Sequence, residues 1–391
     1  MTHPNRPSWL LPVIVIAQLL ATSIWFAPNA VMVALERYWA VEGGVALVTS
    51  AVQAGFIAGT LTFALLGVAD RFHASNVFFA CALAGAAANL AVLALPSVLA
   101  WVLVLRFGVG FALAGIYPVG MRIAAGWYPE GLGRALGFLV GALMLGTASP
   151  HLLQALSYQW DWRVVIFATS AACALAGFAV WRIPEGTHLA RGRGVRFGGV
   201  LKAFRSPGFR ASAFGYFGHM WELYAFWAFL PVWVSAYGYT GAAVSGVTFV
   251  VMAAGGVACM LGGIVGARVG AGPVAWWQLA VSGLFCVISP GLFEAPAAVF
   301  LLGMLIWGAT VAGDSPQFSA LNARFAPPEL VGSALTLANC VGFAITIASI
   351  NLLQWLDGHV SPAWLLIALA LGPALGLMAA RRLMRVQPAP A

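Results

Sequence analysis

The chain has 391 residues, of which 62% are hydrophobic and only 8% are charged, and its mean hydropathy is +0.93. Soluble globular domains are about one quarter charged, so this composition excludes an ordinary soluble protein and predicts an integral membrane protein. The net charge of +8 does not indicate nucleic-acid binding, because the basic residues are spread over short segments between apolar runs.

Apolar runs long enough to cross a bilayer recur along the whole chain. A spanning helix needs roughly 20 apolar residues to cross about 30 Å of hydrocarbon. Hydropathy and the positions of Gly, Pro and charged residues predict an all-α membrane protein with twelve transmembrane helices. The predicted spans are 9–35, 44–68, 74–95, 98–125, 132–156, 163–182, 209–236, 242–266, 273–293, 296–322, 329–355 and 362–382.

The basic residues are distributed unevenly about these spans. If both termini are cytoplasmic, all but three of the 19 Lys and Arg residues lie on the cytoplasmic side, the exceptions being Arg37, Arg106 and Arg163. Cytoplasmic loops of membrane proteins are enriched in Lys and Arg. The asymmetry predicts a multi-pass protein of the cell (inner) membrane with both termini in the cytoplasm.

A polar segment, "RIPEGTHLARGRGVRFGGVLKAFRSPGFR", separates the sixth and seventh predicted spans. Its many basic residues are typical of a cytoplasmic linker that contacts anionic lipid headgroups. We therefore expect a six-helix bundle at 1–182, a basic cytoplasmic linker at 183–208 and a second six-helix bundle at 209–391.

The two predicted bundles carry a repeat. "GIYPVGMRIAAGWYPEGLGRAL" aligns with "GDSPQFSALNARFAPPELVGSAL", so that Gly115 meets Gly313 and Pro118 meets Pro316, an offset of 198 residues. This offset is half the chain, which indicates duplication. Repeated halves in membrane proteins place a substrate site at their interface, so the pattern favours a transporter.

A second pair of segments, "LGVADRFH" at 66–73 and "GIVGARVG" at 263–270, occupies matching positions in the two halves. With the repeat, these residues resemble the major facilitator superfamily (MFS), whose loop between spans two and three has the pattern G-x-L-A-D-R-x-G-R-K. The resemblance covers nearly the whole chain and implies the MFS fold of two six-helix pseudo-repeats and transport by alternating access. The chain departs from the pattern at Leu66, His73 and Ala267.

The resemblance implies a cytoplasmic gate at this loop. Asp70, at the end of the second predicted span, is the expected partner of Arg134, at the start of the fifth, and it also lies near a helix N-terminus. Arg71 and its repeat equivalent Arg268 are further predicted gating residues. The alternative is an interfacial ion pair of little energetic weight.

The fourth and fifth predicted spans bear on the substrate. "RFGVGFALAGIYP" places Arg106 four residues before Gly110, which resembles the intramembrane arginine of the family. The region after Gly115 is similar to anion-transporting branches, although the arginines of nitrate porters in spans two and eight are missing. The fifth span has Pro150 alone, without the Gly-Pro pair and paired glycines of antiporters.

Apolar runs contain several titratable residues, among them His219, Glu222 and Asp314. A charge at the bilayer centre costs from about 3 kcal/mol upwards, so each is a functional-site hypothesis by default. "GHMWELYAF" places His219 and Glu222 in the seventh predicted span, and Asp314 precedes Pro316 in the tenth. Protonation of a buried acid removes a charge that an occluded state must otherwise desolvate, so these three residues are the predicted proton-coupling residues.

The alternatives at these positions remain open. His219 and Glu222 can bond to each other, to one substrate, or across helices as structural bridges. Asp314 can be a coupling acid, a counter-ion to an arginine or a cap at a broken helix. Arg106 can bind a carboxylate or phosphate through its planar fork or serve as a structural counter-ion. His151 is expected to be a satisfied polar group near the outer end of the fifth span.

Aromatic residues near the seventh span can stack on a flat substrate or simply pack. The predicted substrate-binding residues are Arg106, Glu222, His219, Trp25, Gln18 and Tyr117.

The predicted function is secondary active transport of a small organic solute by alternating access, coupled to protons as in symport, with an organic anion as one candidate. A polyspecific drug/proton efflux antiporter is the alternative within this class, and a membrane receptor or intramembrane enzyme is the alternative outside it. No HExxH, GxSxG or P-loop motif occurs, so no enzyme activity, catalytic residue, metal or cofactor is predicted. The expected partners are the solute, protons and the lipid bilayer, without nucleic acid, and the expected state is a monomer.

Overall fold

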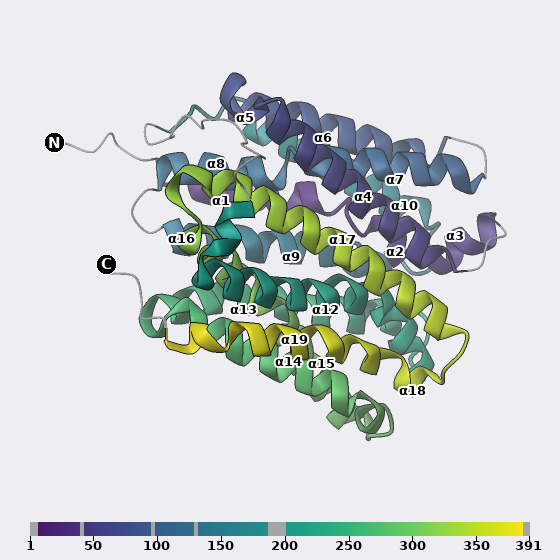
Figure 1. The fold of residues 1–391 in the computed structure, drawn as a ribbon. Helices are drawn as coiled ribbons and strands as arrows, with labels where there is room; N and C mark the ends of the chain where they lie inside the picture. The colour runs from purple at the N-terminus through teal and green to yellow at the C-terminus, as the bar shows by residue number, and fades with distance from the viewer. Residues whose placement is uncertain (1–6, 40–42, 95–97, 129–131, 187–200, 386–391) are drawn as a thin grey trace.

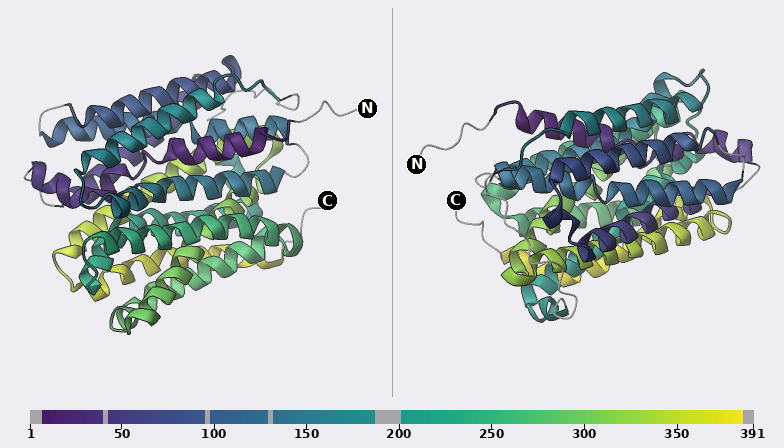
Figure 2. Two further views of the ribbon diagram at one scale, coloured as in Figure 1. Left: turned by 180° about the vertical axis from the view of Figure 1, so that it is seen from behind. Right: turned by 90° about the horizontal axis from the view of Figure 1, so that it is seen from above.

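The computed structural model describes residues 7–39, 43–94, 98–128, 132–186 and 201–385, apart from the side chains of residues 69–70 and 132–134. In this described part, all regular secondary structure is helical. The helices run side by side along one axis, with both termini near the same end of the molecule (Figure 1). The two further views show the same elongated bundle from behind and from above (Figure 2).

The first half of the chain contains α1 (Leu10–Thr22), α2 (Ala27–Ala30), α3 (Met32–Trp39), α4 (Gly44–Leu65), α5 (Val68–Arg71), α6 (Ala74–Ala91), α7 (Leu99–Leu113), α8 (Tyr117–Trp127), α9 (Leu132–Leu156) and α10 (Arg163–Val180). The second half contains η1 (Leu201–Arg205), α12 (Pro207–Tyr237), α13 (Ala242–Val269), α14 (Ala271–Phe293), α15 (Ala297–Gly313), α16 (Ser315–Phe325), η2 (Pro328–Leu330), α17 (Val331–Asp357), α18 (Pro362–Leu365), η3 (Leu366–Ala370), α19 (Leu371–Ala380) and η4 (Arg381–Arg385).

The predicted twelve-helix membrane fold is confirmed. Ten helical segments of the described chain are long and apolar enough to cross a membrane. Two others complete the set: α1 is a shorter apolar helix, and α12 has 31 residues, including the charged Arg210 and Glu222.

Several predicted spans are not continuous helices. The first span is interrupted between α1 and α2, the fourth between α7 and α8, and the tenth between α15 and α16. Pro28, Pro118 and Pro316 each stand in the first turn of the helix that restarts. Proline lacks an amide hydrogen and suits a helix start, which explains why the break falls just before each of them.

The sequence repeat has a structural counterpart. The helices α8 and α16 each have 11 residues, and they begin at Tyr117 and Ser315, which are offset by the same 198 residues as the repeat. Gly110 packs against the carbonyl of Val52, and its repeat equivalent Gly308 packs against the carbonyl of Val251. A Cβ atom at either glycine would collide with that carbonyl, so both halves need the same close helix crossing.

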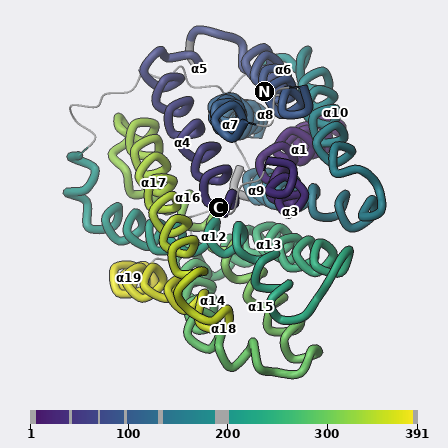
Figure 3. The backbone as a smooth tube through the Cα atoms, turned by 90° about the vertical axis from the view of Figure 1, so that its right-hand side faces the viewer, coloured from purple at the N-terminus to yellow at the C-terminus, as the bar shows by residue number. Residues whose placement is uncertain are grey.

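The two halves meet along two pairs of helices. Figure 3 looks along the bundle and shows α4 beside α17 and α9 beside α13, pairs that are in contact. Gly141 of α9 faces the backbone of Gly256 in α13, so these two helices approach closely. At the end of the bundle remote from the termini, Asn351 of α17 donates a hydrogen bond of 3.0 Å to the Ser50 hydroxyl of α4.

Candidate functional site

Three charged side chains are fully buried among the residues that the structure describes. They are Arg106 in α7, Glu222 in α12 and Asp314 between α15 and α16, and none is more than 1% exposed. Buried charges persist in proteins only where they are paired or hydrogen-bonded. The partners of each therefore indicate what it does.

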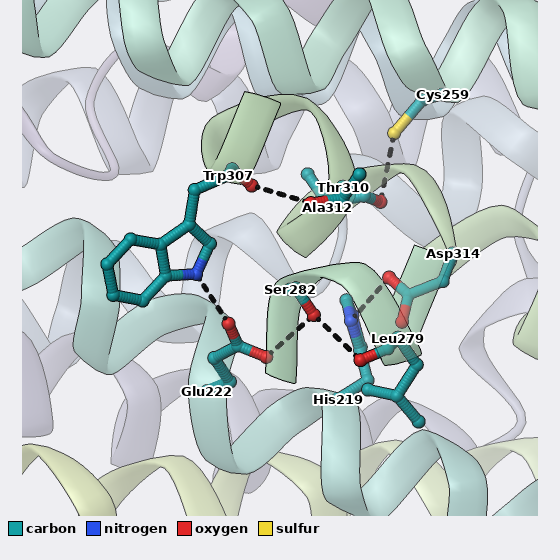
Figure 4. A network of polar contacts seen from close by, with 9 residues as sticks. All are labelled: His219, Glu222, Cys259, Leu279, Ser282, Trp307, Thr310, Ala312 and Asp314. Carbon is teal, nitrogen blue, oxygen red and sulfur yellow. Dashed lines mark hydrogen bonds and ion pairs between the residues drawn. The ribbon is translucent and has the colours of Figure 1, made fainter. Parts of the chain in front are cut away.

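Glu222 is bound by three donors from two neighbouring helices. The indole nitrogen of Trp307 in α15 donates to Oε1 at 2.8 Å. The hydroxyl of Ser282 in α14 donates to Oε2 at 3.0 Å, and Cys286 Sγ lies 3.3 Å from Oε1. Figure 4 shows the carboxylate between Trp307 and Ser282. This arrangement holds α12 against α14 and α15, because a carboxylate can accept several hydrogen bonds at once.

His219 lies against Asp314 rather than Glu222. Its Nδ1 is 2.8 Å from Asp314 Oδ1, and both side chains are fully buried (Figure 4). The atoms are close enough for an ion pair, but their orientation does not meet hydrogen-bond geometry. Neither His219 Nε2 nor Asp314 Oδ2 has a hydrogen-bond partner in the described part of the chain. The pair therefore has unused hydrogen-bonding capacity, whereas Glu222 has little.

Asp314 occupies the break between α15 and α16, as Pro316 suggested. It is the residue that precedes α16, yet its side chain makes no capping hydrogen bond. Its described ionic partner is a histidine and not an arginine. Cys259 of α13 connects this break to the interface between the halves, because its Sγ donates to the carbonyl of Ala312 while its own carbonyl faces Gly137 of α9.

The guanidinium of Arg106 donates hydrogen bonds to the backbone at the break in the first span. Its terminal nitrogens donate to the carbonyl oxygens of Ile24, at 3.1 Å, and Trp25. The same guanidinium donates to Asn89 Oδ1 at 3.1 Å. Only its Nε lacks a partner among the described residues. Main-chain carbonyls at a helix break lack their helical partners and need other hydrogen-bond donors inside a membrane protein. Arg106 supplies these donors. Its guanidinium is therefore not free to bind a carboxylate or phosphate.

Six buried aromatic side chains fill the middle of the interface between the halves. We call them the central aromatic cluster: Trp25, Phe26, Phe56, Tyr224, Trp227 and Phe343. The Trp25 ring centroid lies 5.1 Å from that of Phe56. It lies 5.8 Å from those of Tyr224 and Phe343, with interplanar angles of 20° and 24°. The cluster joins the α1–α2 break and α4 to α12 and α17.

Several buried polar groups have no hydrogen-bond partner among the described residues. Among them are the indole nitrogens of Trp25 and Trp227, the amides of Gln18 and Gln53, and Nε2 of His151. Buried polar groups are normally hydrogen-bonded, so each is a candidate ligand contact. Gln18 and Trp25 were predicted from the sequence. Gln53, Trp227 and His151 were not, although a lone glutamine within an apolar span is a signal that could have marked Gln53.

The other predicted site residues are not gathered at one place. Gln18 lies against Gly120 of α8, inside the first half, and Tyr117 is half-buried at the start of α8. Arg71 and Arg268 are exposed in the last turns of α5 and α13. The side chains of Asp70 and Arg134 lie outside the described residues, so the predicted gate pair stays a prediction.

Two repeated six-helix halves and buried titratable groups near broken helices define the architecture of a membrane transporter. The chain belongs to the major facilitator superfamily, because the family model described as "Major Facilitator Superfamily" matches residues 14–350. No curated protein matches the chain in a sequence search.

Solved structures of this family share the fold. The proton:xylose symporter XylE, bound to 6-bromo-6-deoxy-D-glucose, superposes with a TM-score of 0.74 at 14% identity over 95% of this chain and 94% of its own. A bacterial homologue of the human lysosomal transporter Spinster, inward-facing and unoccupied, gives 0.73 at 14% identity over 100% of both chains. The human organic anion transporter MFSD10 (TETRAN) gives 0.72 at 15% identity over 97% of this chain and 100% of its own.

Proposed function

We propose that the protein is a proton-coupled secondary transporter that moves a small organic solute by alternating access, with the His219–Asp314 pair as the proton site. The observation that carries this proposal is the 2.8 Å contact of two fully buried titratable groups at the break of the tenth span. Moving one proton onto or off such a pair changes the charge buried inside the membrane. That change in buried charge links proton binding to the conformation of the protein.

The position of the pair supports this coupling. His219 belongs to the continuous helix α12, whereas Asp314 belongs to the junction of α15 and α16. A rearrangement at that junction would alter the distance between them. Through Cys259, the junction is also next to α9 of the other half. Protonation of the pair can therefore bias the equilibrium between conformations that differ in the relative position of the two halves.

In this proposal Glu222, the other predicted coupling acid, anchors α12 to its neighbours. Three donors already satisfy its carboxylate. Protonation would weaken those hydrogen bonds, since the charged form is the better acceptor.

We extend the proposal to the cellular setting. The distribution of Lys and Arg supports a cell-membrane protein with both termini cytoplasmic. It also supports domains at 1–182 and 209–391 joined by the basic linker 183–208. The resemblance of segments 66–73 and 263–270 to the family pattern supports an Asp70–Arg134 gate flanked by Arg71 and Arg268. The architecture needs only one chain, so we propose a monomer.

A polyspecific drug/proton efflux antiporter is the second candidate, and the central aromatic cluster favours it.

The proton site can be tested without knowing the solute. Proteoliposomes adsorbed on a solid-supported electrode report charge that moves when the external pH is stepped. We expect a transient current with the wild type, its loss in Asp314→Asn and His219→Gln, and its retention in Glu222→Gln. Currents that persist in both pair variants and vanish in Glu222→Gln would move the proton site to Glu222.

A further inference from the structure

From the central aromatic cluster we infer that the transported solute is a planar, uncharged aromatic molecule with hydrogen-bond acceptors, and that it binds between Trp25 of the first half and Tyr224 and Phe343 of the second. This inference rests on the proposed function of solute transport between the two halves. It names the class of solute and the residues that recognise it.

The ring geometry suits a flat guest. Trp25 is nearly parallel to Tyr224 and to Phe343, with interplanar angles of 20° and 24° and centroids 5.8 Å apart. A flat molecule between two such faces needs two van der Waals spacings of about 3.5 Å each. Because the facing rings belong to opposite halves, a small separation of the halves admits the guest. A bound solute would then touch both halves at once.

Two hydrogen-bond donors belong to this cluster and have no acceptor. The Trp25 and Trp227 side chains are at most 1% exposed, and their indole nitrogens have no partner among the described residues. Trp227 is in ring contact with Phe26 and Tyr224. An indole nitrogen only donates, so the complementary solute carries acceptors, such as ring nitrogens or carbonyl oxygens.

The charges around the cluster favour an uncharged solute. Arg106 donates to the Trp25 carbonyl, and its terminal nitrogens are all engaged there and at Ile24 and Asn89. An anion therefore finds no free guanidinium. A cation would approach two N–H donors and the arginine behind Trp25, which repel it. Aromatic faces alone attract cations, so a cationic probe is the sharpest competitor to include.

Four bicyclic probes of similar size separate these possibilities. Quinoxaline is planar, neutral and carries two ring acceptors, whereas naphthalene has the same plane without acceptors. N-methylquinolinium adds a permanent positive charge, and quinoline-2-carboxylate adds a negative one. We expect ligand-observed NMR titration of the purified protein in nanodiscs to show binding of quinoxaline about tenfold tighter than of either ion.

Matched tryptophan variants locate the contact. Trp227→Phe and Trp25→Phe keep a ring and remove the N–H donor, so each should weaken quinoxaline binding about threefold to tenfold and leave naphthalene unchanged. Trp233 is the control, because it lies in the same helix, is equally buried, and already donates to the Pro362 carbonyl at 2.8 Å. Trp233→Phe should lower the unfolding temperature without changing quinoxaline affinity.

The outcomes are distinct. Absence of quinoxaline binding to a monodisperse wild type, tighter binding of either ion, or unchanged quinoxaline affinity in both donor variants overturns the inference. The pH-step currents require no solute and decide the proton site separately. If the pH-step currents are retained but quinoxaline does not bind as expected, only the solute class is refuted. If quinoxaline binds as expected but the currents are absent, only the proton coupling is refuted.

Discussion

The fourth span of each half breaks at an equivalent place, between α7 and α8 in the first half and between α15 and α16 in the second. The residues at the two breaks differ in charge. In the first half the break before α8 contains the buried apolar residue Ile116, while its repeat equivalent in the second half is Asp314. Arg106, in turn, corresponds to Met304. The first half thus keeps a cation bonded to main-chain carbonyls, and the second keeps a titratable pair with free capacity.

In our proposal Arg106 is a structural group of fixed charge, whereas the His219–Asp314 pair changes charge with protonation. The partners of Arg106 are backbone carbonyls at a helix break and the side-chain amide of Asn89, none of which changes charge. The partner of Asp314 is a histidine, whose imidazole can hold one proton or two. The two halves share one scaffold, and in our proposal the second half uses the group at its break to exchange a proton. The predictions below test this division.

The largest expected effect is on stability in the first half. Arg106→Met installs the residue found at the equivalent position of the second half and removes all donors to Ile24 and Trp25. Two buried carbonyls then lose their charged partner, which should cost about 3 kcal/mol of folding free energy. Thermal unfolding of purified protein measures it. An unfolding temperature equal to that of the wild type would show that Arg106 does not hold the break.

The second effect should be alike in the two halves. Gly110→Ala and Gly308→Ala each place a methyl group against a main-chain carbonyl of the neighbouring helix, Val52 or Val251. Overpacking of this kind should cost about 2 kcal/mol at each site. Thermal unfolding compares the two variants directly. A large cost at one glycine and none at the other would contradict the structural equivalence of the helix crossings.

A smaller effect is expected at Glu222. Glu222→Gln keeps the shape of the side chain but replaces charge-assisted hydrogen bonds from Trp307 and Ser282 with neutral ones. We expect a loss of about 1 kcal/mol in stability, seen as a modest drop in unfolding temperature. The pH-step current should be unchanged. Lost current at preserved stability would contradict the anchoring role.

The smallest effect on stability, and the largest on proton exchange, is expected at Asp314. Asp314→Asn is nearly isosteric and removes an acid that has no well-oriented hydrogen bond in the described structure. Its unfolding temperature should stay near that of the wild type, with a change below about 1 kcal/mol. The pH-step current should disappear. A strongly destabilised variant would show instead that Asp314 is a structural group, like Arg106.

Much of the fold could be predicted because it depends on local signals. Long apolar runs determine the spans, and Pro316 marks the break in the tenth span, whereas the break before Pro118 in the fourth span was not predicted. The repeat follows from residues that recur at constant spacing. The break in the first span was missed, since Pro28 stands inside a run whose hydropathy continues on both sides.

The partners of the buried polar residues were harder to predict. Glu222 is bound by Ser282, Cys286 and Trp307, which are 60 or more positions away in sequence and have no shared motif with it. Arg106 donates to two main-chain carbonyls, which no side-chain pattern reveals, and to Asn89 of another helix. Bonding between His219 and Glu222 was one of the alternatives that their spacing left open, but tertiary packing directs His219 to Asp314.

The crossing of α9 and α13 has a mechanical consequence. Gly141 and Gly256 each lie close to the other's carbonyl oxygen, while Met260 of α13 packs on Gly141 and Leu145 of α9 packs on Gly256. The distance between two packed helices depends on the side chains at their contact, so the two glycines let the axes of α9 and α13 lie close together. A tilt of one half about this close contact would widen one end of the bundle and narrow the other.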